Sequence, residues 1–383
     1  MKKSRWSPGK RKLPTVLIVD DVEEEAASAK LSLAGIVNAI DRVPNSVSLR
    51  DLGKASLVLV DFRLKEWPQR ERQSTPSLKP KDGIALVATL RSNLDSDPKR
   101  SPTAFALRSG RLSELTGTFS PERREHAIAR MIDMDWVFSK TQDPDDFARE
   151  VLSLAGAVSR LPHPWPPIIK SRETLIRLLG LRKSFGWFNR AFGEVDKSNP
   201  PQDSSAQNTK GMAVIRWLLH DVLPFPNFLL DERYLAARFH VTPKSMRQAL
   251  SAKRSTVRRT LSEFEYRGLL HDFSGRRWWR AGIESWIWQQ TAGRPFDKTA
   301  LKAIAQKLSP KLNNIPFLNP VVVLDDQFLP TDDLLDLSSV VQISPDDWPN
   351  TADPAWASVD SVKNSPLIAA RVTLQDRQKL NLP

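Results

Sequence analysis

Four short apolar runs, separated by longer stretches with helical periodicity, constrain the fold of this 383-residue chain more than any other feature. The runs cover residues 16–19, 57–60, 105–107 and 136–138. Short apolar runs that alternate with helical patterns indicate buried parallel strands in a doubly wound α/β sheet. Because the carboxyl ends of parallel strands share one edge of the sheet, polar residues that follow these runs should meet in one cleft.

The polar residues at the ends of these runs form a chemically specific set. They are, in chain order, Asp20, Asp21, Asp61, Ser109 and Lys140. Three carboxylates, one hydroxyl and one ammonium group in one cleft suit a phosphoryl group held together with a divalent metal ion. The alternative is that they are ordinary strand-end polar residues, although three crowded carboxylates without a cation would raise one another's pKa values.

The order of these residues resembles the response-regulator receiver domain, which has a flavodoxin-like sheet of five parallel strands. The resemblance covers roughly residues 13–160, and its matching stretches are residues 16–21, 58–61, 82–84, 106–109 and 137–140. A polar insert at residues 66–81 and a long stretch between Ser109 and Lys140 depart from the family pattern. Val137 stands where the family often has an aromatic switch residue, with Phe138 beside it.

The resemblance implies a role for each residue of the set. Asp61 would accept a phosphoryl group from a sensor histidine kinase or a phosphotransfer protein. Mg²⁺ would be held by the side chains of Asp21 and Asp61, by the carbonyl of Arg63, and by Asp20 through water. Ser109 and Lys140 would bind the phosphoryl group. No enzymatic activity is expected beyond phosphoryl acceptance and self-dephosphorylation at Asp61.

Composition narrows the remaining function classes. The chain contains no cysteine, which excludes disulfides, thiolate metal sites and cysteine nucleophiles. It has no apolar run of 18 residues and no signal-peptide core, so we expect a cytoplasmic protein without a membrane partner.

The formal net charge of +13 is unevenly distributed along the chain. Residues 165–295 contain 22 basic and 11 acidic residues, whereas residues 321–383 contain 4 basic and 10 acidic residues. A basic middle predicts a polyanionic partner.

The same patterns predict the domain organisation. A basic flexible arm precedes the receiver, and a proline-rich linker follows it. A basic, mostly helical, winged-helix-like domain and a small acidic α+β region complete the chain. The predicted boundaries are residues 1–12, 13–160, 161–167, 168–295 and 296–383.

Residues 234–250 resemble a helix-turn-helix, because apolar residues recur at the spacing that packs two short helices across a turn. Thr242 and Pro243 suit the start of the second helix, and His240 stands at the turn position where glycine is frequent. A further helix to Gly268 and a hairpin over residues 273–280 would complete a winged variant. The predicted DNA contacts are Lys244, Ser245, Arg247, Arg254, Arg258, Arg276 and Arg277. Residues 255–261 are an alternative reading helix.

The sequence therefore favours a phosphorylation-controlled regulator with a DNA-binding output. Double-stranded DNA is the expected partner, and a homodimer is a candidate assembly. The alternative is a phospho-switched adaptor that binds a protein and no DNA. The acidic tail from Val321 onward would either mask the basic middle or complete a domain core.

Overall fold

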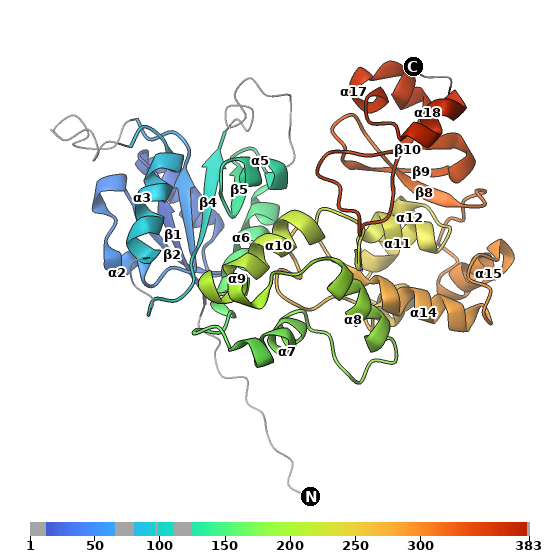
Figure 1. The fold of residues 1–383 in the computed structure, drawn as a ribbon, viewed down its shortest axis with the longest axis horizontal. Helices are drawn as coiled ribbons and strands as arrows, with labels where there is room; N and C mark the ends of the chain where they lie inside the picture. The colour runs from blue at the N-terminus through green and yellow to red at the C-terminus, as the bar shows by residue number, and fades with distance from the viewer. Residues whose placement is uncertain (1–12, 66–79, 96–98, 111–124, 381–383) are drawn as a thin grey trace, which may run out of the picture.

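The computed structural model describes residues 13–65, 80–95, 99–110 and 125–380. Figure 1 shows an N-terminal α/β unit in blue and green, a helical middle in green to orange, and a C-terminal group of strands and helices in red. Within the described residues, no helix is long and apolar enough to cross a membrane.

The N-terminal unit is built on a five-stranded parallel sheet. The strand order is β2-β1-β3-β4-β5, which is the flavodoxin-like order of a doubly wound sheet. The predicted fold of this unit is therefore confirmed. The strands are β1 (Thr15–Val19), β2 (Asn38–Arg42), β3 (Leu57–Asp61), β4 (Ala104–Ser109) and β5 (Trp136–Ser139).

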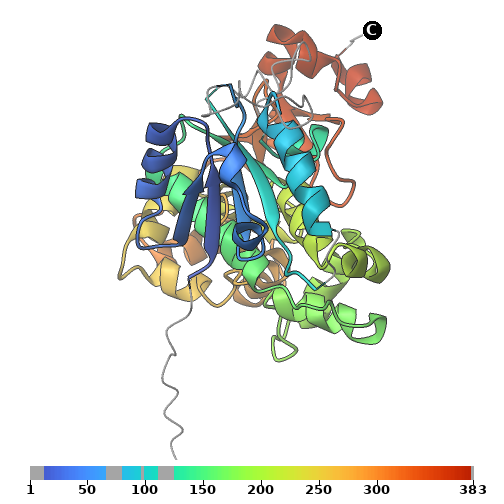
Figure 2. The ribbon, with the colours of Figure 1, turned by 90° about the vertical axis from the view of Figure 1, so that its left-hand side faces the viewer.

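Helices cover both faces of this sheet, as Figure 2 shows. On one face, α1 and α6 pack against β1, β3, β4 and β5 through residues such as Ala29 and Val151, which are fully buried. On the other face, α2, α3 and α5 pack through residues such as Val87 and Ile128. The helices are α1 (Glu23–Ser32), α2 (Leu49–Leu52), α3 (Gly83–Asp95), α5 (Glu125–Met131) and α6 (Pro144–Ser159). The sequence also predicts a helix that starts at Ser120, because a capping serine is followed by Pro121, and this start lies outside the described residues.

The middle of the chain is mostly helical, as predicted. Its helices are α7 (Ile168–Leu178), α8 (Phe188–Lys197), α9 (Asp203–Asn208), α10 (Met212–Trp217), the π-helical turn η4 (Leu218–Val222), α11 (Glu232–Arg238), α12 (Pro243–Ser251), α13 (Thr256–Leu261), α14 (Arg280–Gln290) and α15 (Lys298–Leu308). Two short strands, β6 (Leu229–Leu230) and β7 (Trp278–Trp279), pair antiparallel.

The region predicted as a helix-turn-helix contains two short helices joined by a turn. α11 and α12 pack together through Leu235, Phe239 and Met246, all of which are fully buried. Thr242 caps α12 by accepting a hydrogen bond from the backbone N–H of Ser245. His240 adopts a φ of 52°, which a turn position requires and which histidine tolerates.

The region after α13 differs from the predicted helix and wing. α13 ends at Leu261 because residues 264–266 pair with residues 277–279: Tyr266 N–H donates to Arg277 O at 2.8 Å, and Trp279 N–H donates to Phe264 O at 2.9 Å. In the loop between these arms Leu269, Leu270 and Phe273 are buried, and Phe273 packs edge-on against Trp136 of β5, with ring centroids 4.8 Å apart. This hairpin therefore packs on the receiver and does not project as a free wing.

The proline-rich segment at residues 161–167 is not a free spacer, in contrast to the prediction. Leu161 and Trp165 are both only 6% exposed, and Trp165 donates a hydrogen bond to Ser171. One apolar core runs from the receiver sheet into α7 and α10. An ion pair between the partly exposed Arg216 and the buried Asp135, at 2.6 Å, adds a polar link across the same junction.

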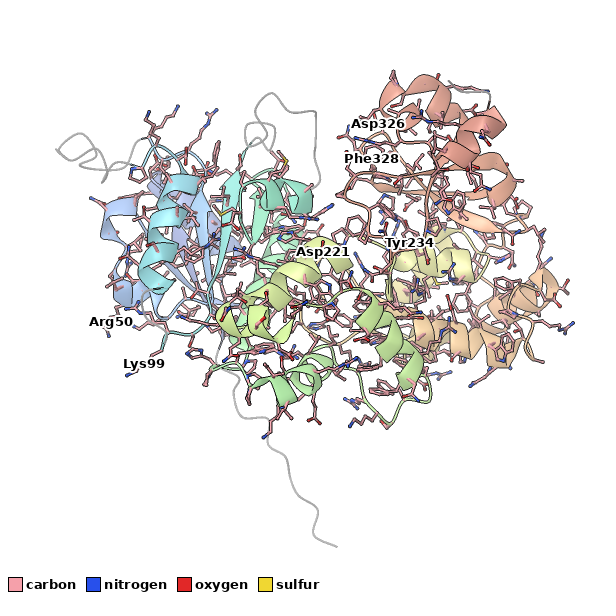
Figure 3. All side chains as sticks on the ribbon, viewed as in Figure 1. Arg50, Lys99, Asp221, Tyr234, Asp326 and Phe328 are labelled. Atoms are coloured by element: carbon pink, nitrogen blue, oxygen red, sulfur yellow. The ribbon has the colours of Figure 1, made fainter. Side chains whose placement is uncertain are left out.

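The C-terminal region combines strands and helices, as predicted. Its elements are β8 (Pro320–Leu324), β9 (Pro330–Asp336), β10 (Val340–Ile343), β11 (Ala355–Ser358), α16 (Val359–Asn364), α17 (Pro366–Ala369) and α18 (Leu374–Leu380). Val322 and Leu334 of the β8–β9 hairpin pack with Leu230 and Tyr234, and Figure 3 shows Tyr234 on α11 beneath these strands. The tail thus completes a core with the helix-turn-helix region, which is one of its two predicted roles.

Candidate functional site: an acidic cluster at the strand ends

Three carboxylates meet at the carboxyl edge of the parallel sheet. Asp20 and Asp21 follow β1 directly, and Asp61 is the last residue of β3. β1 and β3 are neighbours in register, so their ends coincide. One oxygen from each carboxylate lies within 4.8 Å of the others, and the three residues are 2%, 7% and 6% exposed. The predicted convergence of these residues is therefore confirmed.

Lys140 places its ammonium group against this cluster. Its Nζ lies 2.7 Å from Asp61 Oδ1 and 3.7 Å from Asp20 Oδ2. The same nitrogen lies 3.4 Å from Glu25 Oε2, in the first turn of α1. Glu25 was not predicted from the sequence, although its position four residues after Asp21 on a helix that leaves the same edge would have been a usable signal.

Burial is the main influence on the charge states of the cluster. It raises the pKa of Asp20 from 3.8 to about 6, with a further upward contribution from the charge of Asp61. Burial also raises the pKa of Asp61, and the hydrogen bond from Lys140 opposes this only in part. Burial lowers the pKa of Lys140, but the hydrogen bond and charge of Asp61 outweigh it and leave that pKa raised. Asp20 and Asp61 are thus poorly stabilised as anions, and an added cation would favour their charged form.

Backbone groups fix the orientation of two of the carboxylates. Asp20 Oδ1 accepts a hydrogen bond from Val22 N–H at 3.0 Å, and Asp61 Oδ2 accepts one from Arg63 N–H at 2.9 Å. The chain then turns back so that Gly83, at the start of α3, lies directly beside β3. A Cβ on Gly83 would be 2.3 Å from Asp61 O, so only glycine fits this close approach.

A cavity of about 480 Å³ opens above the cluster. Its lining includes Asp21, Asp61, Arg63, Ser109 and Lys140, so five of the six predicted receiver-site residues face one space. Ser109 is the last residue of β4 and is 3% exposed. Its carbonyl accepts a hydrogen bond from Lys140 N–H at 2.8 Å, which ties the two strand ends together.

The donor set of the cluster fits Mg²⁺. Its side-chain ligands are carboxylate oxygens, which hard divalent cations prefer. Mg²⁺ also retains several waters, and the cavity leaves room for them and for a phosphoryl group. Asp21 and Asp61 line this cavity, and Asp20 lies beside them within the same cluster.

The structure divides the predicted DNA contacts into buried and exposed residues. Ser245 is 3% exposed, and its hydroxyl donates to Thr242 O and accepts from Asn313 N–H at 3.1 Å. Arg277 donates to the carbonyls of Ser274 and Leu223, and burial lowers its pKa. These two side chains hold the local structure together, and their placement does not suit contacts with DNA.

Two further predicted contacts are engaged within the protein. Arg247 on α12 lies 2.9 and 3.0 Å from the carboxylate oxygens of Asp332, on β9 of the acidic tail. Arg276 donates to Leu250 O at 3.2 Å and lies 3.6 Å from Glu265. Arg247 also pairs with Glu232 of α11, so the tail supplies one of the two carboxylates that neutralise this residue of the predicted reading helix.

The other predicted contacts are exposed residues of α12, of α13 and of the loop between these helices. Lys244 on α12, Arg254 before α13 and Arg258 on α13 are exposed, and no ion pair joins them to any residue that the structure describes. Lys253 and Arg259, which the prediction omitted, lie in the same segment and are also exposed. We call these five residues the α12–α13 ridge.

Comparison with known proteins gives limited information. No family model matches the chain, and no curated protein matches it. Among solved structures, a CheY-like response regulator receiver domain protein from Methanospirillum hungatei JF-1 is 16% identical, with 39% of this chain and 98% of that chain covered and a TM-score of 0.26.

Several structures of the response regulator RcsB also match. An RcsB–DNA complex is 16% identical over 54% of this chain and 93% of that chain, with a TM-score of 0.27. RcsB from Salmonella enterica serovar Typhimurium, bound to the promoter P1flhDC in the presence of the phosphomimetic BeF3−, is 17% identical over 53% and 92%, with a TM-score of 0.26. TM-scores this low say nothing about function, and the features of this chain that bear on its function are its sheet order and its acidic cluster.

Proposed function

We propose that this chain is a response-regulator-like protein in which Asp61 accepts a phosphoryl group with the help of Mg²⁺. The observation that carries the proposal is the convergence of three buried carboxylates and Lys140 at the carboxyl edge of a β2-β1-β3-β4-β5 sheet. The donor would be a histidine kinase or a phosphotransfer protein, which would place the chain on the cytoplasmic side of the membrane.

The residues at the site have separate tasks in this transfer. An oxygen of the ionised Asp61 carboxylate attacks the phosphorus atom, the bond from phosphorus to the donor breaks, and its electron pair leaves with the donor. Mg²⁺, when bound, would neutralise negative charge on the transferring phosphoryl group. Lys140, 2.7 Å from Asp61, favours the ionised carboxylate and can then pair with the phosphoryl oxygens. Ser109 lines the same cavity and can donate a hydrogen bond to one of them. Attack by water on the aspartyl phosphate would reverse the modification.

Phosphoryl uptake from acetyl phosphate tests this proposal. Intact-mass measurement of the full chain should show one added phosphoryl group in the presence of Mg²⁺ and none with a chelator. Asp61→Asn should abolish the addition. Asp82→Asn is a matched control, because Asp82 caps the start of α3 next to the site but lies outside the cluster, and asparagine can also cap a helix. Equal labelling of the Asp61 variant would contradict the proposal.

We propose duplex DNA as the target of the output, with the α12–α13 ridge as the contact surface. Five exposed basic side chains on one ridge can neutralise phosphates and release counterions, which makes affinity depend on salt. This shifts the proposed contacts toward residues 255–261, the alternative reading helix. The proposed assembly on DNA is a homodimer.

A salt titration of duplex binding tests this output. Replacing Arg254 and Arg258 with alanine should weaken binding and reduce the slope of log affinity against log salt by about 2. Lys302→Ala with Lys307→Ala on α15 is a matched control, because both lysines are exposed and lie outside the ridge. Unchanged binding in the ridge variant would contradict the ridge as the contact surface. No duplex binding by the parent protein would favour the adaptor function, for which the packing of the predicted wing on the receiver also speaks.

A further inference from the structure

A second and larger cavity lies between α7 and the first arm of the hairpin. Its volume is about 1000 Å³, and it shares no lining residue with the cavity above Asp61. Glu173, Glu263 and Glu265 are its acidic lining residues. Basic residues outnumber them two to one, and they are Arg160, Lys170, Arg177, Arg182, Lys183 and Arg267. An excess of positive charge in a concave site of this kind attracts an anion.

The walls of this cavity are fixed against each other. Leu269 N–H, in the hairpin loop, donates to Leu178 O at the end of α7 at 2.9 Å. Gly180 follows α7 with a φ of 73°, and a Cβ there would lie 3.3 Å from the backbone of Arg267. Hydrogen bonds also hold two of the cations: Arg160 donates to Gly268 O at 3.4 Å, and Arg267 donates to Ser262 O at 3.2 Å. The cavity is therefore formed before any ligand binds.

The other four basic residues have no ion-pair partner among the residues that the structure describes. They are Lys170, Arg177, Arg182 and Lys183, and all are exposed. Of the acidic lining residues, Glu265 lies 3.6 Å from Arg276 and 4.0 Å from Arg267, so part of its charge is already neutralised. A ligand with several negative charges would relieve the repulsion among the unpaired cations.

One aromatic ring accompanies the cations. Phe185 lines the cavity, is partly exposed, and stacks on Trp187 with ring centroids 4.6 Å apart. Aromatic rings that are partly exposed in basic grooves stack on nucleic-acid bases. Guanidinium groups bind phosphates in a bidentate manner, and the lining residues Arg177, Arg182 and Arg267 could do so here.

We propose that this cavity binds a nucleoside polyphosphate. The volume is that of a small-molecule site, and the cations and the aromatic ring match the two parts of such a ligand. A duplex is the less suitable polyanion, because the basic residues line a hollow between two walls and not a ridge. This site would give the protein a second input that is independent of phosphoryl transfer at Asp61.

Calorimetric titration of the full chain with ATP, tripolyphosphate and adenosine tests the proposal. A chelator keeps the acidic cluster free of Mg²⁺ during the experiment. We expect saturable binding of ATP, weaker binding of tripolyphosphate, and no binding of adenosine. Replacing both Arg182 and Lys183 with alanine should weaken ATP binding by at least about tenfold, whereas Lys302→Ala with Lys307→Ala should leave it unchanged.

Several results would overturn the proposal. If ATP does not bind at millimolar concentration, the cavity is not a nucleotide site. If the two double variants lose ATP affinity equally, the binding is non-specific electrostatic attraction. Equal affinities for ATP and tripolyphosphate would show that the cavity does not recognise the nucleoside and binds only the phosphates. Loss of duplex DNA binding in the Arg182 and Lys183 variant, without any ATP binding to the parent protein, would assign these cations to DNA.

Discussion

Asp20→Asn should stabilise the protein at neutral pH in the absence of divalent cations. In the folded protein, burial raises the pKa of Asp20 to about 6, whereas its ordinary value is 3.8. Between these values the folded state binds the proton and the unfolded state does not, so stability falls as the pH rises through this window. A pKa difference of about 2 corresponds to about 3 kcal/mol of lost unfolding free energy at pH 7.

The asparagine variant avoids this cost while it retains the local structure. The side-chain carbonyl of the introduced asparagine can still accept the hydrogen bond from Val22 N–H, which Asp20 accepts at 3.0 Å. The variant loses the attraction to Lys140 Nζ, which lies 3.7 Å from Asp20 and keeps its closer partner Asp61. We therefore expect a net gain in unfolding free energy of about 2–3 kcal/mol above pH 6. The gain should disappear below pH 4, where the wild-type carboxyl group is protonated in both states.

Urea unfolding in the presence of a chelator measures this difference. The two proteins should be compared at pH 7 and at pH 4, with Asp82→Asn as a control that leaves the cluster intact. Added Mg²⁺ should stabilise the wild-type protein and narrow the gap to the variant, because a ligand that binds only the folded state adds to its stability. An Asp20 variant that is less stable than wild type at pH 7, or a gain of equal size at both pH values, would refute the reasoning.

Two further predictions concern ion pairs between distant segments. Asp135→Ala should lower the unfolding free energy by about 2 kcal/mol, because it leaves the buried Phe105 N–H without its acceptor and removes one of the two carboxylates that pair with Arg216 at the junction of the receiver and the middle. Thermal or urea unfolding will measure the loss. Asp332→Asn should raise duplex DNA affinity at low salt, because it removes the carboxylate of the tail from Arg247 and leaves Glu232 as the remaining partner, whereas Asp333→Asn, the exposed neighbour, should not raise it. Equal affinities of the two variants in fluorescence anisotropy would show that the tail does not mask this helix.

The receiver and its site were predictable from the sequence because their signals are local. Each apolar run is short and ends at a polar residue, which defines both the strand and its carboxyl end. Once the strands are parallel, geometry alone brings Asp21 and Asp61 together. Glu25 was missed because its role depends on which face of α1 points toward Lys140, and a strand pattern does not give that information.

The errors in the middle of the chain arise from contacts between residues far apart in the sequence. The Ser245 hydroxyl accepts a hydrogen bond from Asn313 N–H, 68 residues away in the sequence. Arg277 donates a hydrogen bond to the carbonyl of Leu223, 54 residues away. Arg277 and Arg258 are the same residue type with the same charge. The sequence therefore could not show that Arg258 is exposed whereas Arg277 is engaged inside the protein. The prediction of a free wing was wrong for the same reason, because Phe273 of the hairpin packs against Trp136 of the receiver.

The position of the phosphoryl group on the chain tests the central claim most directly. After reaction with acetyl phosphate and Mg²⁺, borohydride reduces an aspartyl phosphate to homoserine, and peptide mass spectrometry locates the altered residue. The proposed chemistry predicts homoserine at residue 61 and unchanged Asp20 and Asp21. Reduction at either of these two aspartates, or phosphate retained on a serine or histidine, would contradict the assignment of Asp61 as the acceptor.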